Sequence, residues 1–379
     1  MQGRVEFAKS ILKLVVLSGC AVAFLVLYKA DLVNAILLEP AALPQALAGQ
    51  MLNVLIAVGI SLAGIVAAAH DDPEAGAASF AAALAAQPGV DLTIVAPVGI
   101  PPFPLSLHPR YRALRALPGR EDWNGLPVHR PRFTLIPRYG TRFNPVRVAR
   151  AVMASVRGQT FDVIDAQFFY PDGPAAMRVA EALGRPFSIK ARGADISHFG
   201  HEPSTAPQLV AAAERAAGLL AVSNAMRRDM AAIGIDAEKV AVHYTGIDKA
   251  RFHPADRAAA RAALGIGDAP AILTVGALIP RKGQALVIEA LPALPGVHYW
   301  LAGAGEEEGR YRALARQHGV ADRVHLMGPI ANADLPQLYR AVDAVVMPSA
   351  SEGLANAWVE SLACGTPIVI SDAGGAAEL

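Results

Sequence analysis

The chain has 379 residues, enough for two ordinary domains, and 53 % of them are hydrophobic, which allows each domain a full core. Its 34 lysines and arginines nearly balance 33 aspartates and glutamates, and a formal charge of +1 argues against nucleic acid as a partner. The two cysteines, Cys20 and Cys364, are far apart and fit neither a disulfide framework nor a metal site, which favours a reducing compartment.

The first 70 residues contain two long apolar runs. Residues 11–28 carry one charge, Lys13, and residues 51–69 carry none. Each run is close to the ~20 residues that span the hydrocarbon core of a bilayer, so we expect a hydrophobic segment that forms a membrane hairpin. Because basic residues precede the first run, both ends of the hairpin are expected in the cytoplasm. The chain would then lie at the cytoplasmic face of the inner membrane, or in the cytoplasm if the segment is not inserted.

A second reading of this region is that Met51 begins a soluble domain, with residues 52–59 as a buried strand and residues 74–86 as the following helix. Periodicity alone does not separate a buried strand from a span. The sequence segment GRVEFAKSILK, followed by the two apolar runs, resembles the start of the third membrane segment of the export-switch protein of type III secretion and flagellar systems. That resemblance implies a foreign membrane fragment ahead of the rest of the chain.

From about residue 90 onward, short apolar runs alternate with amphipathic stretches, which is typical of an α/β fold with parallel sheets covered by helices. Two doubly wound domains are expected, over 71–255 and 265–379, with a polar, alanine-rich linker between residues 253 and 270. The proline-rich residues 97–109 are expected to form a surface loop. The predicted strands are residues 91–97, 162–166, 187–190, 219–223, 271–275, 297–303, 323–328, 343–349 and 367–371, and the first domain's predicted helices are residues 145–156, 174–183 and 207–216.

A strand, a polar turn, a helix and a second strand are expected over residues 343–371. Glu352 stands before the helix and Glu360 lies eight residues later, so both carboxylates are predicted on one helix face, about two turns apart. The amides of Gly353 and Leu354, at the positive end of the helix dipole, would suit a diphosphate. Carboxylates accept several hydrogen bonds at once and suit sugar hydroxyls. These residues predict a nucleotide-sugar site.

The sequence segments EGLANAWVE and SLACGTPIV resemble the Glu-x7-Glu signature of the retaining GT-B glycosyltransferases of family 4. The resemblance extends from about residue 88 to the end of the chain. It implies a GT-B fold and transfer of a sugar from a nucleotide-sugar donor to a hydroxyl acceptor with retention of anomeric configuration. It also implies that Glu352 lies by the donor sugar and that Glu360 binds the ribose.

The sequence segment LTVGALIPRKG resembles the strand, the glycine turn and the Lys-Gly helix start of the same family. They imply that Lys282 neutralises the leaving diphosphate, with Arg281 assisting and Gly276 at the turn. An ammonium beside a departing phosphate stabilises negative charge that develops in the transition state. The family often has an arginine at the position of Ala277, so one phosphate contact is missing here.

The sequence segments DVIDAQFFYPDG and SIKARGADI resemble the family's acceptor-side loops. They point to Asp172, Arg192 and Asp195 as site residues, because all three follow predicted strands. Relatives commonly have a histidine near Gln167 or Arg192, and this chain does not. We expect Arg192 to take over its contact with the donor sugar, and we count it among the catalytic residues with Glu352 and Lys282.

No Asp-x-Asp pair stands beside a predicted strand end, so no metal and no cofactor are expected; the nucleotide sugar is the donor substrate and a glycan or lipid-linked molecule is the acceptor. The chain stops soon after Gly374 and Gly375, where relatives continue, and it is expected to be a C-terminally incomplete enzyme. The alternative is a catalytically inactive, membrane-anchored fusion or fragment that serves as a binding or scaffold piece.

Overall fold

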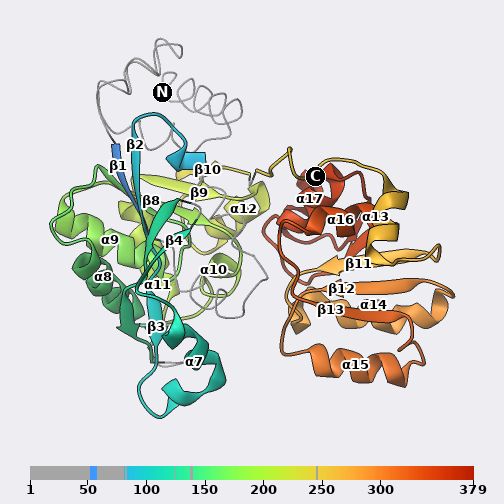
Figure 1. Cartoon of the computed structure of the whole chain (residues 1–379). Helices are drawn as coiled ribbons and strands as arrows, with labels where there is room; N and C mark the ends of the chain where they lie inside the picture. Colours follow the sequence, from blue (N-terminus) through green and yellow to red (C-terminus); the bar gives the residue numbers. More distant parts are fainter. Residues whose placement is uncertain (1–51, 58–80, 82, 124, 137–139, 245) are drawn as a thin grey trace, which may run out of the picture. The chain divides into compact units, whose positions relative to one another are not determined.

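The computed structural model describes residues 52–57, 81, 83–123, 125–136, 140–244 and 246–379. The chain forms two compact units, and the second takes in the chain from Thr245 onward (Figure 1). Both units are α/β, as the alternation of apolar and amphipathic runs predicts.

The first unit is built on an eight-stranded sheet in the order β10-β9-β8-β7-β1-β2-β5-β4. Neighbouring strands are parallel except β4 and β5, which are antiparallel. Two further strands, β3 and β6, form a small parallel pair. The strands are β1 (Leu52–Ala57), β2 (Val90–Val95), β3 (Val98–Ile100), β4 (Arg120–Trp123), β5 (Leu126–His129), β6 (Arg132–Thr134), β7 (Val163–Ala166), β8 (Phe187–Ala191), β9 (Gly218–Ala221) and β10 (Val240–Val242).

The helices of this region follow the sequence signals closely. Proline occupies the first turn of α8 and α11, where its missing amide hydrogen leaves no gap in the helix, and Gly184 ends α9 in the left-handed conformation. Helix α9 packs against α8, α11 and β7. The helices are α7 (Pro109–Ala116), α8 (Asn144–Ser155), α9 (Asp172–Leu183), α10 (Ala194–Ser197), α11 (Ala206–Arg215) and α12 (Asn224–Ala232), with short 3-10 turns η2 (Leu105–Leu107) and η3 (Ala237–Lys239).

The predicted membrane span over residues 51–69 is wrong for its described part. Leu52–Ala57 is strand β1, which lies between β2 and β7 in the interior of the sheet. Strands inside parallel sheets are typically continuous apolar runs, which is why the composition of this segment resembles that of a span. Residues 58–69 and the first run, residues 11–28, lie outside the described residues. Within the described residues, no helix combines the length and apolarity needed to cross a bilayer.

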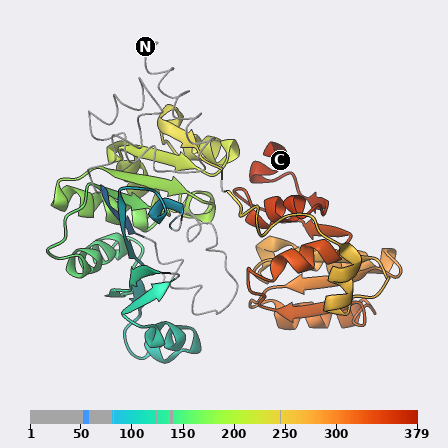
Figure 2. The ribbon, with the colours of Figure 1, turned by 45° about the horizontal axis from the view of Figure 1, so that its top comes forward.

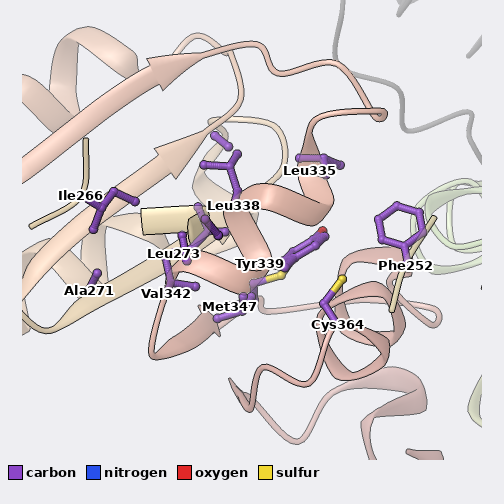
Figure 3. Close-up of a cluster of buried hydrophobic side chains, with 14 of the residues drawn as sticks. Phe252, Ile266, Ala271, Leu273, Leu335, Leu338, Tyr339, Val342, Met347 and Cys364 are labelled. Carbon is purple, nitrogen blue, oxygen red and sulfur yellow. The ribbon is translucent and has the colours of Figure 1, made fainter. Parts of the chain in front are cut away.

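The second unit contains a five-stranded parallel sheet in the order β13-β12-β11-β14-β15. Successive residues of each strand point to opposite faces, and each face has its own core. One core, shown in Figure 3, joins the sheet to α13, α16 and α17 through side chains such as Leu273, Leu338 and Tyr339. The other joins it to α14 and α15 through Tyr299 and Tyr311. Helices therefore cover both faces of the sheet (Figure 2).

The strands of this unit are β11 (Ala271–Val275), β12 (His298–Ala302), β13 (Val324–Gly328), β14 (Ala344–Met347) and β15 (Ile368–Ile370). The helices are α13 (Arg257–Leu264), α14 (Gln284–Ala290), α15 (Glu308–Gln317), α16 (Leu335–Ala341) and α17 (Asn356–Ala363), with 3-10 turns η4 (Pro280–Lys282), η5 (Leu291–Ala293) and η6 (Gly374–Glu378).

The alanine-rich stretch expected as a linker is instead helix α13, which packs against α16. Asp256 caps its first turn by accepting hydrogen bonds from the amides of Ala258 and Ala259, and Gly265 ends it in the left-handed conformation. Alanine has the highest intrinsic helix propensity, so the composition that suggested a linker is that of a helix. The expected loop over residues 97–109 also contains β3, a strand outside the main sheet.

Candidate functional site

Three loops meet at the carboxyl edge of the second sheet, after the neighbouring strands β11, β14 and β15. The amide of Ala350 donates to the carbonyl of Arg281 at 2.9 Å, and the amide of Gly375 donates to the carbonyl of Gly353 at 2.7 Å. A Cβ atom at Gly374 would lie 1.7 Å from the carbonyl oxygen of Glu352. The loops are therefore in direct contact, at the sheet edge where ligands bind in open α/β folds.

Lys282 and Glu352 form an ion pair at this edge. The ammonium of Lys282 lies 2.5 Å from Oε1 of Glu352, and both side chains are largely buried, at 15 % and 9 % exposed. Arg281 Nη1 lies 3.9 Å from the other carboxylate oxygen and donates to the carbonyl of Ser351 at 2.6 Å. Two cations thus surround one carboxylate, and three of the sequence-predicted site residues are brought together.

Gly353 and Leu354 lie in the loop that leads into α17, which begins at Asn356 and has no side-chain cap. Within the described part of the chain, the amides of these two residues have no acceptor among the backbone hydrogen bonds of turns and loops. The predicted two-turn helical spacing from Glu352 to Glu360 is wrong, because Glu352 precedes the helix by four residues. The loop amides still lie directly before the helix, where its dipole favours an anion.

Glu360 is on α17 and is buried, at 5 % exposed. Its Oε2 accepts a hydrogen bond of 2.9 Å from the hydroxyl of Tyr339 on α16. Burial, followed by the negative charge of Glu360, raises the pKa of Tyr339 well above its usual value, so the phenol stays protonated as the donor. This contact fixes the carboxylate against the interior of the unit.

Gly276 follows β11 with φ of 141°, a conformation that disfavours side chains. A Cβ atom at this position would come within 3.9 Å of Cε of Lys282, with no nearer neighbour. The glycine therefore leaves space beside the lysine side chain. On the loop after β14, Ser349 is buried, and its Oγ has no hydrogen-bond partner among the described residues.

The acceptor-side candidates lie at the carboxyl edge of the first unit's sheet. Arg192 follows β8, and its Nε donates to the carbonyl of Gln167 at 2.8 Å while Nη2 donates to the side chain of Gln167. Asp195 is fully buried and accepts from the amides of Phe169 at 2.9 Å, Gly193 at 2.6 Å and Arg192 at 3.1 Å. Burial raises the pKa of Asp195 even though these amides oppose the shift. Asp172 begins α9 and is also buried.

Asp195 thus ties the loop after β7 to the loop after β8, and Gln167 orients Arg192. No cluster of three or more metal-ligating side chains occurs within the described ranges. Asp172, Arg192 and Asp195 belong to the first unit, and Lys282, Glu352 and Glu360 belong to the second.

The sequence matches two family profiles that together cover most of the chain: "Glycosyltransferase Family 4" over residues 74–251 and "Glycosyl transferases group 1" over residues 256–379. The chain belongs to the group 1 glycosyltransferases. The first profile contains the first unit's candidates and the second contains Lys282, Glu352 and Glu360, so every predicted site residue lies within the part of the chain that matches the family.

Relatives of known name include the D-inositol 3-phosphate glycosyltransferases of Mycolicibacterium gilvum, 39 % identical over 146 residues, and of Mycobacterium tuberculosis, 39 % identical over 149 residues. The matched regions are 37 % and 38 % of this chain and 33 % and 31 % of the relatives, so the similarity spans about a third of their length.

Solved structures establish the GT-B fold. Anabaena HepE in complex with UDP-glucose matches with a TM-score of 0.60 and 23 % identity, over 86 % of this chain and 82 % of that chain. Sucrose-phosphate synthase from Thermosynechococcus elongatus matches with a TM-score of 0.66 and 19 % identity over the same shares. At these identities the likeness concerns the fold.

One part of the glycosyltransferase's polar interior was missed by sequence reasoning. Asp165 on β7 accepts hydrogen bonds from Ser188 at 2.5 Å and from Gln167, and Nζ of Lys190 on β8 lies 2.6 Å from Nδ1 of His243, which follows β10. The signal in the sequence was one charged residue in each of two short strands: Asp165 in the sequence VIDA and Lys190 in the sequence FSIK. Burial lowers the pKa of Lys190 well below its usual value and raises that of Asp165.

Proposed function

We propose that this glycosyltransferase moves a sugar from a nucleotide diphosphate to a hydroxyl acceptor with retention at the anomeric carbon. The observation that carries the proposal is the pairing of Lys282 with Glu352 at the carboxyl edge of the second sheet, beside the Gly353–Leu354 loop. Family membership supports the transferase reaction, and the Glu-x7-Glu resemblance supports retention.

The proposed roles follow from charge and position. Lys282, with Arg281, stabilises negative charge on the leaving diphosphate, and the amides of Gly353 and Leu354 bind its oxygens. Glu352 contacts the donor sugar, and Glu360 binds the ribose hydroxyls. Without donor, Lys282 is neutralised by Glu352, so donor binding exchanges a carboxylate partner for a phosphate. The exchange leaves Glu352 with fewer partners and ready to accept sugar hydroxyl hydrogen bonds.

We propose a uridine diphosphate sugar as the donor, because the solved relative HepE is complexed with UDP-glucose. The acceptor is a glycan or lipid-linked hydroxyl compound that binds at the carboxyl edge of the first sheet. There the buried Asp172 and Asp195 lie in the loops, and Arg192, which is partly exposed, is the side chain left to contact a ligand. The relation of Arg192 to Gln167 supports this assignment, since a guanidinium already oriented by two hydrogen bonds loses little freedom on binding.

Calorimetric titration with a panel of uridine, guanosine and adenosine diphosphate sugars tests the proposal. We expect micromolar binding of a uridine diphosphate sugar, weakened by Lys282→Ala and by Glu360→Ala. The control is Arg312→Ala on α15, an exposed cation paired with Glu308 that should leave binding unchanged. Absence of binding to every donor would favour the inactive scaffold instead. NMR of the product then reports whether the anomeric configuration is retained.

A further inference from the structure

A segment of the first unit, residues 98–120, projects from the end of β2 and exposes a cluster of large apolar side chains; we call it the arginine-rich projection. Phe103 is 78 % exposed, Leu105 52 % and Leu107 51 %. Among the described residues, no other five-residue stretch exposes three large apolar side chains. Isolated apolar residues on a surface are ordinary, whereas a contiguous group marks an interaction site.

The projection is also strongly basic. Residues 98–120 contain four arginines, at positions 110, 112, 115 and 120, and no aspartate or glutamate. Glu121 and Asp122 follow directly, and Glu121 is paired with Arg130. Arg112, Arg115 and Arg120 are exposed. In a chain whose formal charge is +1, this is a local concentration of positive charge beside exposed apolar groups.

The exposed side chains belong to an ordered local structure. Leu114 and Tyr111 of α7 turn inward and pack with Val98, Ile100 and Leu117. Arg132 of β6 donates from Nη2 to the carbonyls of Arg115 at 2.9 Å and Leu117 at 3.2 Å, which anchors the end of α7. The amides of Leu107 and His108 are satisfied within η2, by the carbonyls of Pro104 and Leu105. Because this framework is in place, the exposed groups need little ordering on binding.

The projection begins at the sheet edge that carries the acceptor-side residues. The amides of Ala96 and Val98 donate to the carbonyls of His129 and Pro131 at 2.8 Å each, so the chain continues directly beyond the carboxyl ends of β2 and β5. Figure 1 shows α7 beyond β3, away from the main sheet. Arg192 follows β8 at the carboxyl edge of the same sheet.

We propose that the arginine-rich projection docks the protein on a bilayer that contains anionic phospholipids. Phe103, Leu105 and Leu107 enter the boundary between headgroups and acyl chains, and the exposed arginines pair with lipid phosphates. An acidic protein or a nucleic acid would match the charge, but the lipid surface also accounts for the exposed phenylalanine and leucines. The site is separate from the apolar run at residues 11–28, and the proposal stands whether or not sugar transfer occurs.

The test uses the full chain and a readout local to the projection. A tryptophan placed by Phe103→Trp should be quenched by brominated lipids in vesicles of phosphatidylcholine and phosphatidylglycerol, beyond the quenching of the native chain. Leu286→Trp, at a position 59 % exposed in the second unit, is the matched control and should gain no quenching. If the chain floats with the vesicles while the tryptophan at position 103 is unquenched, another segment binds and the proposal is wrong.

Substitutions that remove positive charge provide a second test of the proposal. Each arginine near an anionic surface raises the partition coefficient of the protein between water and vesicles about fivefold. Arg112→Gln combined with Arg115→Gln should therefore lower that coefficient, measured by tryptophan quenching, about 25-fold. The control pair, Arg312→Gln with Arg316→Gln on α15, removes the same charge from another exposed helix and should have little effect. Equal losses for both pairs would overturn the assignment to this surface, as would an absence of vesicle binding altogether, which would leave a protein or nucleic acid as the partner.

Discussion

The hydroxyl of Tyr339 donates to the buried carboxylate of Glu360 at 2.9 Å, which joins helix α16 to helix α17 inside the second unit. A hydrogen bond to a charged group is stronger than one between neutral groups, and it also satisfies part of a carboxylate that burial would otherwise destabilise. Tyr339 therefore holds in place the residue that we assign to the ribose.

Replacing Tyr339 by phenylalanine should lower the free energy of unfolding by about 1.5–3 kcal/mol, because it removes a donor from a buried charge. Tyr311→Phe is the matched control: this tyrosine is also buried, but it donates to neutral oxygens of Gln284 at 3.1 Å and Ile279 at 3.3 Å. For it we expect about 0.5–1.5 kcal/mol. Urea denaturation measures both, and a loss for Tyr311→Phe as large as that for Tyr339→Phe would contradict the charge argument.

Gly374→Ala should disturb the donor loop. At φ of 60° a side chain is disfavoured, and a Cβ atom would also lie 1.7 Å from the carbonyl oxygen of Glu352, so the backbone of one loop must move. Gly319→Ala is matched in conformation, with φ of 66°, but its Cβ has no neighbour within 4 Å. We expect about 1 kcal/mol from strain at Gly319 and at least ~2 kcal/mol at Gly374, with donor affinity lost only in the latter. Thermal unfolding and donor titration distinguish the two; equal effects would count against contact between the loops.

The stability of the first unit should fall as the pH is lowered through the range below 6.5. Burial, followed by the positive charges of Lys190 and Arg192, lowers the pKa of His243 to about 3. In the unfolded chain the imidazole has the higher pKa, so it is protonated there first as the pH falls. Its contribution to the free energy of unfolding is therefore complete above pH 6.5 and is lost as the pH falls toward 3. The loss should be about 2 kcal/mol between pH 6 and pH 4.5.

The measurement is the difference in unfolding free energy between the native chain and His243→Gln at each pH, which reports on the histidine together with Lys190, the residue that it contacts. Asp165, whose pKa is raised by burial, acts in the opposite direction above its unfolded pKa and is common to both proteins. A pH-independent difference would show that His243 titrates normally in the folded chain.

Much of this fold was predictable because parallel strands are apolar runs between amphipathic helices. Residues 162–166, 187–190 and 271–275 are strands by that criterion, and the structure has strands at Val163–Ala166, Phe187–Ala191 and Ala271–Val275. Strand β1, which pairs with β2 and β7, was ambiguous for a physical reason: strands inside parallel sheets and membrane spans are both uninterrupted apolar runs. Helix α13 was misread because alanine is compatible with a linker as well as a helix.

The site was predictable residue by residue but not in its contacts. The sequence indicated Lys282 and Glu352 separately, 70 positions apart, and their ion pair depends on the adjacency of β11 and β14. Likewise Lys190 and His243 are 53 positions apart and meet because β9 alone lies between β8 and β10. Spacing along one element predicts which residues share a face, whereas the order of strands in a sheet is set by packing of the whole unit.

Lys282→Ala and Glu360→Gln should affect donor turnover in different ways. If Lys282 stabilises charge on the leaving diphosphate, its contribution grows in the transition state, and its removal should lower kcat by about 10²–10³. If Glu360 binds the ribose, its hydrogen bonds are the same in ground and transition states, so Glu360→Gln should raise KM for the donor with a smaller change in kcat. Arg281→Ala removes a half-exposed cation 3.9 Å from Glu352 and should have a weaker effect than Lys282→Ala. Steady-state kinetics over a range of donor concentrations separates these cases. A rise in KM alone for Lys282→Ala would assign it to ground-state binding, and an unchanged KM for Glu360→Gln would remove it from the ribose site.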